Sequence, residues 1–559
     1  MEMKLKYARG ISYSQLYNDS NETVDSLLDG LPTCESVLWL TYIGNRKVNM
    51  TISEHEYNII CPLLFQFDSD LRDRIIKFMG PVGQPTDQFI DLPPLLKTVE
   101  YLLNHSNYES RELTKEDKGR LFKAYLIFCD EFLIHQDEKF ILKSYTADDM
   151  LRYYMPFALR MNKVLGVVDP LIELPKSKMF LIDFPKKDTL FASYVSTYLK
   201  AKGCQSSSQY MLQLFSLVDS LLFNEQKTNV IKIAPESQCV ICDFLDNFCV
   251  NLQDVNSTIN IQEYPLYKIS DDTYCVLYIK FFVNKFFRSL LFDMAKELEK
   301  QKFLGTKGVS AYVQLKQLVG QKFIEQYLFY DVINRVLASS KYKKVTGEQL
   351  NTIGPGLPDY YARKANRIFI FEFKDIQLNA KIIESNDYDT IISAVEKELV
   401  ENEKGRPKGV TQLANDIEKH LYKLVGKGSK DELISVYPIL VYTDSCFDIE
   451  GFNYYLNNRF REIISERNID DMVRVKDLIM VNIDALIMFE KVFADKKLKF
   501  DVLLNEYISY KESKNEYQVV PFGKYLFQRA KAKGYFYKAS YLVRETINQL
   551  ERLYGESEN

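Results

Sequence analysis

Residues 354–375 have the sequence GPGLPDYYARKANRIFIFEFKD, which carries the clearest structural pattern in the chain. If the segment 367–374 is a β-strand, its side chains alternate between two faces. One face then holds Ile368, Ile370, Glu372 and Lys374, and the other holds Phe369, Phe371 and Phe373. Because both faces are largely apolar, the pattern predicts a strand buried on both sides that ends in a carboxylate and an ammonium group.

The carboxylate and the ammonium group at the end of this strand require compensation. Burying a lone Glu or Lys costs several kcal/mol, roughly, unless a partner or a metal ion offsets it. The polar segment 363–366 predicts a turn, so residues 359–362 and 367–374 would form a hairpin that brings Asp359 beside Glu372. The alternatives are that Asp359 is a turn residue after Pro358 and that Glu372 and Lys374 form an exposed edge-strand ion pair, worth about 0–1 kcal/mol.

Two converging carboxylates, Asp359 and Glu372, predict a divalent-metal site. Mg²⁺ prefers a few protein oxygens together with water and substrate phosphate. The adjacent Lys374 would orient or help to deprotonate the attacking water and would offset charge on the phosphate. Gly356 and Pro358 fix the backbone that leads into Asp359, and a glycine there permits the close approach of a phosphate chain.

Pro358-Asp359 followed by Glu372-Phe373-Lys374 on an apolar strand resembles the PD-(D/E)XK superfamily of nucleases, which includes many restriction endonucleases. The resemblance covers about residues 320–485. It implies hydrolysis of phosphodiester bonds with Mg²⁺ or Mn²⁺, with the cation bound by Asp359, Glu372 and the main-chain carbonyl of Phe373. Lys374 would then act on the water and the phosphate.

The segments around the motif follow the order that the resemblance implies. A helix from residue 320 to 338 precedes it and carries Glu325, where some members place a further acidic ligand. The segment GVTQLANDIEKHLYKL looks like the second core helix, with Gln412 where several members carry a glutamine facing the site, and residues 438–444 look like the fourth strand. The alternatives are that Glu325 and Gln412 are ordinary helix-surface side chains. The long connection between Lys374 and Gln412 predicts an extra helix or a substrate-contacting loop.

The whole chain is expected to be an α/β protein, α+β overall, with a restriction-endonuclease-like mixed sheet flanked by helices and a largely helical N-terminal region. Four segments are expected: a mixed N-terminal piece (1–93), a helical accessory domain (94–260), the nuclease domain with its leading hairpin and helix (261–490) and a helical extension (491–559). Residues 36–53 suggest a strand, a turn at Gly44-Asn45 and a second strand. A Gly/Pro-rich stretch at residues 80–94 predicts an early boundary, and Asp271-Asp272 predicts a hairpin turn.

The composition narrows the classes of function. The 559 residues carry a net charge of −4, so any contact with nucleic acid has to come from a local groove rather than from a generally basic surface. Nine dispersed cysteines and the absence of an apolar leader predict a reduced, cytoplasmic protein. No apolar run reaches the roughly 20 residues of a membrane span, and no GxxxxGK[ST] phosphate-binding loop occurs.

Three weaker signals favour structural explanations over functional ones. Cys239 and Cys242 have metal-like spacing, but only Cys249 lies nearby, so a zinc site is disfavoured against buried small residues. The four histidines, His420 among them, form no ligand-spaced pair. The basic, aromatic segment 529–538 could hold a nucleic-acid backbone, and an exposed helix end is the favoured alternative.

These features predict a metal-dependent deoxyribonuclease, an endonuclease of restriction or anti-phage defence. Association with defence rests on the fold-level resemblance. An RNA-cutting enzyme with the same site and a non-catalytic nucleic-acid-binding or scaffold subunit remain open as alternatives. The expected partners are DNA, or RNA, and a protein partner or a second copy of the chain, because cutting both strands needs two active sites. No membrane partner is expected.

Overall fold

The computed structural model describes residues 9–17, 22–48, 57–79, 87–88, 90–137, 147–165, 169–223, 229–235, 238–252, 260–305, 308–425, 433–513, 519–535 and 541–558. They form two compact units, each built from segments that are separated in the sequence. Unit 1 comprises residues 1–144, 193–297 and 553–559, and unit 2 comprises residues 145–192 and 298–552. The four expected segments, in contrast, follow one another along the chain.

Unit 1 is mainly helical. Its helices are α1 (Tyr13–Leu16), α2 (Val24–Leu28), α3 (Thr33–Val48), α4 (Tyr57–Leu64), α5 (Ser69–Met79), α6 (Leu92–Asn104), α7 (Lys115–Asp137), α11 (Ser207–Phe223), α12 (Gln238–Asp246) and α13 (Ile279–Val283). Its strands are β1 (Arg9–Gly10), β2 (Asp87–Gln88), β3 (Val230–Lys232), β4 (Leu266–Ser270) and β5 (Thr273–Val276). Helices α10 (Thr189–Ala201), α14 (Leu290–Lys300) and α26 (Tyr541–Glu558) carry residues of both units. The expected hairpin turn at Asp271-Asp272 is confirmed, because β4 and β5 pair antiparallel on either side of it.

The expected strand–turn–strand at residues 36–53 is wrong where it is described, because residues 36–48 belong to helix α3. Val37, Leu40 and Ile43 are at most 1% exposed and recur at helical spacing. Gly44 lies inside the helix where α6 approaches: a Cβ there would lie 3.1 Å from a methyl group of Leu95. Gly44-Asn45 therefore marks a close helix contact instead of a turn. Most of the expected boundary at residues 80–94, namely 80–86 and 89, falls outside the described residues.

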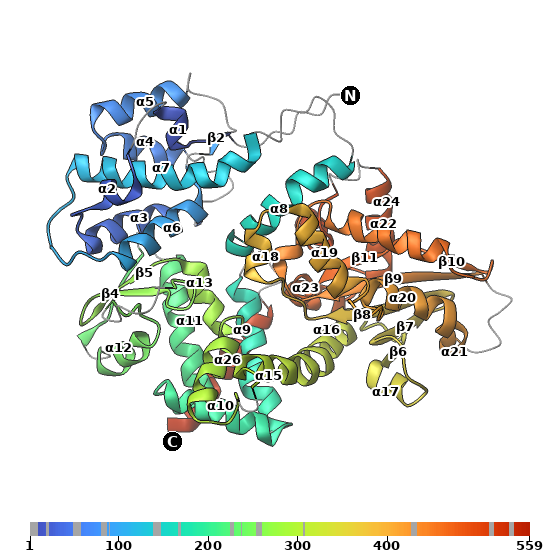
Figure 1. Cartoon of the computed structure of the whole chain (residues 1–559). Helices are drawn as coiled ribbons and strands as arrows, with labels where there is room; N and C mark the ends of the chain where they lie inside the picture. Colours follow the sequence, from blue (N-terminus) through green and yellow to red (C-terminus); the bar gives the residue numbers. More distant parts are fainter. Residues whose placement is uncertain are drawn as a thin grey trace. The chain divides into compact units, whose positions relative to one another are not determined.

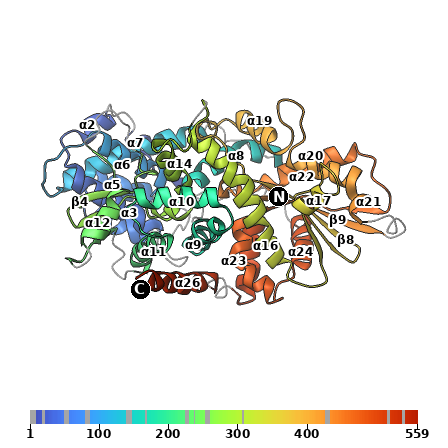
Figure 2. The same cartoon turned by 90° about the horizontal axis from the view of Figure 1, so that it is seen from below.

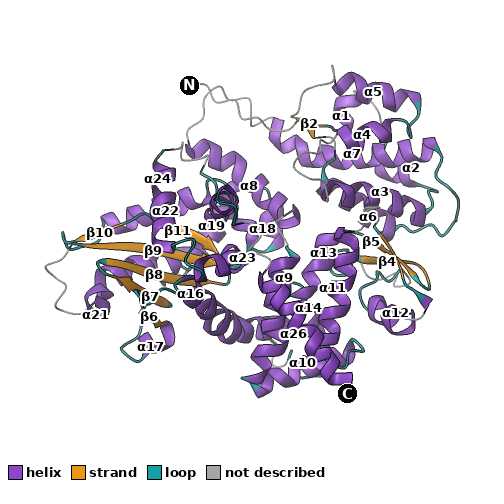
Figure 3. Cartoon of the chain, turned by 180° about the vertical axis from the view of Figure 1, so that it is seen from behind, coloured by secondary structure: helices purple, strands orange, loops and turns teal. Residues whose placement is uncertain are grey.

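Unit 2 contains a mixed sheet of six strands with the order β10-β9-β8-β7-β6, in which β11 also pairs with β9. The strands are β6 (Lys343–Thr346), β7 (Tyr360–Lys364), β8 (Arg367–Lys374), β9 (Ile434–Tyr442), β10 (Val473–Val475) and β11 (Ile479–Asn482). Strands β6, β7 and β8 pair antiparallel, whereas β9 runs parallel to β8 and to β10 and β11. Figures 1 and 3 show this sheet surrounded by helices. The expected α/β class with a mixed sheet in the second half of the chain is confirmed.

Helices cover both faces of this sheet, as Figure 2 shows from below. The helical elements of unit 2 are α8 (Ala147–Leu165), α9 (Pro170–Lys178), η1 (Met179–Asp183), η2 (Phe184–Lys186), α15 (Ala311–Leu318), η5 (Val319–Phe329), α16 (Tyr330–Val336), α17 (Gly347–Asn351), α18 (Ala380–Glu384), α19 (Tyr388–Leu399), α20 (Gly409–Asn415), η6 (Asp416–His420), α21 (Leu421–Val425), α22 (Phe452–Ser465), α23 (Ile483–Ala494), α24 (Phe500–Glu512) and α25 (Phe522–Ala532). Helices α18 and α19 occupy the connection from Lys374 to Gln412, which confirms the extra helix expected there.

Strand β8 is buried on both faces, as its two-residue period predicts. Ile368 and Ile370 are fully buried in a core that includes Val395 of α19, Leu413 of α20 and Leu456 of α22. On the other face, the ring of Phe369 stacks on Tyr437, that of Phe371 on Phe500 of α24 and that of Phe373 on Phe329 of η5. Two layers of helices thus fix the strand that ends at Glu372 and Lys374.

Among the described residues, no helix combines the length and the apolar character that a membrane span requires.

Replacing Phe369 by Ala should lower the free energy of unfolding of unit 2 by about 3–5 kcal/mol, because it empties a fully buried site between Tyr437 and Tyr342. Urea denaturation measures the change. Ile353→Ala, at a side chain that is 61% exposed, is the control and should change it by less than about 0.5 kcal/mol. Equal losses for both variants would contradict a core position for Phe369.

Candidate active site

The Glu372–Lys374 pair lies at the end of an interior strand. Strand β8 has β7 on one side and β9 on the other, and Glu372 is 1% exposed. The Lys374 Nζ lies 2.9 Å from the Glu372 Oε2. The alternative of an exposed edge-strand ion pair is therefore wrong. Removing one partner of such a buried pair leaves an uncompensated charge, which costs about 3–5 kcal/mol.

Asp359 immediately precedes β7 and is bound to the same end of β8. Its Oδ2 accepts a hydrogen bond from the Phe373 N–H at 2.7 Å, and its carbonyl oxygen accepts one from the Gly347 N–H at 2.7 Å. A Cβ on Gly347 would lie 2.8 Å from that carbonyl oxygen, so the approach requires glycine. The hairpin register, with Tyr360 opposite Phe371, brings Asp359 and Glu372 to the same end of the two strands.

Glu325 reaches the site from η5, an 11-residue π-helical segment. Its side chain is half-buried, and burial, followed by the charge of Asp359, raises the pKa of Glu325 to about 7, while Lys374 acts in the opposite direction. π-Helical turns are rare and are frequent at functional sites. Glu325 is thus electrostatically coupled to Asp359 and Lys374, unlike an ordinary solvated helix glutamate.

Gln412 lies on α20, the helix that packs against Lys374. A Cβ on Gly409, the first residue of α20, would lie 3.5 Å from the Lys374 Cε and 2.8 Å from a methyl group of Leu440, so the helix end fits closely. Gln412 is partly buried, and its Oε1 has no hydrogen-bond partner among the described residues. The described contacts do not join Gln412 to Asp359, Glu372 or Lys374, so its expected role in the site stays a prediction.

Asp416 is a further acidic residue that the sequence analysis missed. It is 2% exposed and begins η6, a π-helical turn that continues α20. Burial, followed by the charge of Asp359, raises the pKa of Asp416 to about 8, and Lys374 counteracts this. The signal that could have found it is its place four residues after Gln412, on the same helix face.

Lys374 is the shared counter-charge for four described carboxyl groups: Glu325, Asp359, Glu372 and Asp416. Burial disfavours its charged form, yet Glu372, Asp359 and Glu325 raise the pKa of Lys374 above its ordinary value. Burial, then Asp359, raises the pKa of Glu372 well above its ordinary value. One ammonium cannot compensate four carboxylates, of which Glu372 and Asp416 are buried, so the protonated forms of these two are favoured.

The donor set fits a hard divalent cation. Asp359, Glu372 and the Phe373 carbonyl supply oxygens only, and Mg²⁺ typically takes one or two protein carboxylates and keeps several waters. Within the described parts of the chain, no three His, Cys, Asp or Glu side chains are grouped so that together they could hold a metal ion. The two-carboxylate donor set requires no such group of three.

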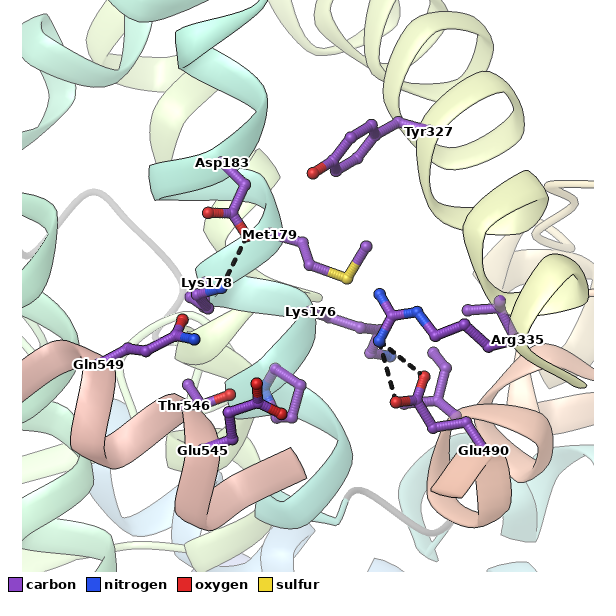
Figure 4. Close-up of a pocket in the computed structure, with 13 residues that line it drawn as sticks. Lys176, Lys178, Met179, Asp183, Tyr327, Arg335, Glu490, Glu545, Thr546 and Gln549 are labelled. Atoms are coloured by element: carbon purple, nitrogen blue, oxygen red, sulfur yellow. Dashed lines mark hydrogen bonds and ion pairs between the residues drawn. The ribbon is translucent and has the colours of Figure 1, made fainter. Parts of the chain in front are cut away.

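A separate cavity of about 180 Å³ lies among α9, η1, η5, α16, α23 and α26 of unit 2 (Figure 4). Its charged walls pair with one another. Lys178 lies 2.9 Å from Asp183, and Arg335 binds both oxygens of Glu490 at 2.9 and 3.1 Å. None of the predicted catalytic residues lines it.

The weaker sequence signals gain little from the structure. Cys242 is buried and Cys249 partly buried, and the side chain of Cys239 lies outside the described residues. The described residues contain no group of three or more His, Cys, Asp or Glu side chains that could hold a metal ion. In the basic segment 529–538, residues 536–538 lie outside the described residues, and Arg529 pairs with Glu506. His420 contacts a site residue, because its Nδ1 lies 3.1 Å from the Asp416 Oδ1.

The chain matches no family model, no curated protein and no solved structure.

Asp416→Asn should flatten the dependence of stability on pH. The folded-state pKa of Asp416, about 8, lies above its ordinary value of 3.8. Stability from this group is therefore complete below pH 3.8 and is lost as the pH rises through about 8. Asn does not titrate, so the melting temperature of the variant minus that of the wild type should increase from pH 6 to pH 9, measured in EDTA. Parallel melting curves across this range would contradict burial of an ionisable group at this position.

Proposed function

We propose that the chain is a metal-dependent phosphodiester hydrolase that cuts DNA. The observation that carries the proposal is the meeting of Asp359, Glu372 and Lys374 at one end of β8. The order of elements supports it, since the helix formed by η5 and α16, the hairpin of β7 and β8, the helix α20 and the parallel strand β9 follow in the order that the PD-(D/E)XK resemblance implies. Fold order alone would not be sufficient, because function depends on the site.

The proposed mechanism assigns the carboxylates to the cation. Asp359 and Glu372 would hold Mg²⁺ or Mn²⁺, with the Phe373 carbonyl as a third oxygen. A bound cation of this kind neutralises charge on the phosphate and makes a bound water more acidic. The N–H of Phe373 already binds Asp359, so the residue of β8 that holds this carboxylate would also supply the carbonyl ligand. This arrangement orients Asp359 without a mobile side chain.

Lys374 and Glu325 would have different roles: one would stabilise charge on the phosphate, and the other would accept a proton from the attacking water. The raised pKa of Lys374 keeps its ammonium group charged, so it suits the stabilisation of negative charge on the phosphate better than it suits the removal of a proton. Glu325, with its pKa raised to about 7 by burial and Asp359, lies near the pKa that a general base at neutral pH requires. Glu325 would therefore accept the proton of the attacking water.

DNA is the proposed substrate, and an endonuclease of restriction or anti-phage defence is the proposed context. RNA cutting would use the same three side chains, so the substrate test includes RNA. A scaffold without catalysis is disfavoured, because burying Glu372 beside Lys374 has a cost that a purely structural subunit would avoid with an apolar pair. A second copy or a protein partner is proposed for cutting both strands.

Purified full-length protein should cut plasmid or linear DNA with Mg²⁺ or Mn²⁺, and EDTA should stop the reaction. Lys374→Ala should lower the cutting rate by at least about 100-fold, because it removes the charge that faces the phosphate. Gel assays with DNA and RNA measure the rate and identify the substrate.

Lys491→Ala is the matched control for Lys374→Ala. It also breaks a lysine–carboxylate pair of unit 2, with Asp495, the C-cap residue of α23, at 3.1 Å, but both side chains are about one-third exposed. Its cutting rate should equal that of the wild type. Metal-dependent cutting that survives Lys374→Ala unchanged would refute the proposed site, and wild-type protein that binds but never cuts either nucleic acid would support the scaffold.

Mn²⁺ should raise the melting temperature of the wild type, and the rise should be larger at pH 8.5 than at pH 6. Burial raises the pKa values of Glu325 and Glu372, so cation binding has to displace protons and becomes tighter as the pH increases. Differential scanning fluorimetry measures the rise. Asp359→Asn should abolish it and Asp495→Asn should not. A rise of equal size in Asp359→Asn would place the cation elsewhere.

A further inference from the structure

His420 connects the second helix of the site to the turn that leads into Asp359. Its Nδ1 lies 3.1 Å from the Asp416 Oδ1, one helical turn earlier. The two side chains are 17% and 3% exposed, so the contact is shielded from solvent. It is a fixed contact between neighbouring turns of η6, and it orients the ring.

The Cε1 of the ring, between its two nitrogens, faces Gly356. A Cβ on Gly356 would lie 3.6 Å from the His420 Cε1, and Gly356 has φ +76°, where glycine is favoured. Burial and the charge of Lys423 lower the pKa of His420, and a hydrogen bond from the ring to the Gly356 backbone opposes that shift. Since Nδ1 binds Asp416, Nε2 is the nitrogen available to donate to Gly356.

The contacts from Asp416 through His420 to Gly356 need two protons, and the two side chains can supply both. Asp416 shares one proton with Nδ1, whichever of the two atoms carries it, and Nε2, as the remaining nitrogen, would carry a second proton toward the Gly356 backbone. A buried carboxyl group beside a half-buried imidazole thus satisfies its hydrogen bonds without an unpaired charge.

Gly356 is three residues before Asp359, with Pro358 between them restricting the backbone. Past this turn, Asp359 is held at β6–α17 through Gly347 and at β8 through Phe373. The turn itself is anchored from a third direction, by the helix that carries Gln412 and Asp416. Three elements therefore converge on the backbone that sets the position of the Asp359 carboxylate.

We propose that Asp416 and His420 are positioning residues: Asp416 orients the His420 ring, and the ring holds the 354–358 turn so that Asp359 reaches the end of β8. This inference rests on the proposed function only for its effect on metal binding and cutting. Its structural part concerns the protein without metal and is tested separately.

The test uses amide hydrogen exchange in the metal-free full-length chain. His420→Ala should increase exchange at the Phe373 and Gly347 amides by about tenfold or more, because both donate to Asp359 and depend on its position. Exchange in β9 and β11 should stay at the wild-type rate. Asp416→Ala, which keeps the ring but removes its orienting partner, should increase exchange at the same two amides, and it serves as the test if His420→Ala does not fold.

Two further variants distinguish positioning from simple packing. His420→Gln retains a side-chain N–H donor and should restore slow exchange at Phe373. His105→Ala is the matched control, since the His105 ring contacts Tyr101 of its own helix in unit 1, and it should leave both amides unchanged. Unchanged exchange at Phe373 in both Ala variants, or a uniform increase throughout unit 2, would overturn the proposal.

Mn²⁺ binding to the same variants connects the inference to the proposed function. His420→Ala should weaken the Mn²⁺-dependent rise in melting temperature, and His420→Gln should recover it. If the wild type neither binds Mn²⁺ nor cuts, the proposed function fails while the exchange result still decides the positioning role. If the wild type cuts and exchange at Phe373 does not respond to either Ala variant, the positioning role fails alone.

Discussion

The ion pair between Glu372 and Lys374, buried at the end of an interior strand, is the constraint on which the rest of unit 2 depends. A carboxylate that is 1% exposed requires a counter-charge, and Lys374 provides it at 2.9 Å. That requirement limits which residues can lie next to the pair. Gly409 has no side chain where α20 meets Lys374, and Asp359 is held by a backbone N–H. Gly409 thus leaves room for the Lys374 side chain, and the backbone N–H provides a hydrogen bond to the Asp359 carboxylate.

The sequence was sufficient for the strand and its hairpin because these are local patterns. The two-residue period of β8 places isoleucines and phenylalanines on opposite faces, and burial on both faces follows from composition alone. The polar turn lies between strands that pair directly, with Lys364 opposite Arg367. Strand β6 was missed, since KKVT is short, polar and exposed at its first residue, and only its pairing with β7 makes it a strand. The error at α3 has a similar cause, because Gly44 signals a turn unless a neighbouring helix is known to approach it.

The site beyond the motif was only partly predictable from spacing. The four-residue step from Gln412 to Asp416 is a signal, but the rest of the site depends on how the helices pack and on their irregularities. Asp416 and His420 stand four residues apart, which is ordinary on any helix. What brings them to the site is the packing of α20 on β8 together with a π-helical turn that begins at Asp416. Such a turn changes which residues share a face. Glu325 lies in a π-helical segment as well, so a regular helical period misplaces side chains in both helices of the site.

The contact between Lys374 and Glu372 and the raised pKa values of the buried carboxyl groups have a functional consequence under the proposed mechanism. With Lys374 bound to Glu372 and the pKa values of Glu372 and Asp416 raised by burial, the site has little excess negative charge to attract a cation by itself. A cation and a phosphate entering together would supply one positive and one negative partner. The first releases protons from the carboxyl groups, and the second gives Lys374 a new counter-ion. The two binding events therefore assist each other. The site would bind a metal ion alone, or a nucleic acid alone, more weakly than it binds either one in the presence of the other.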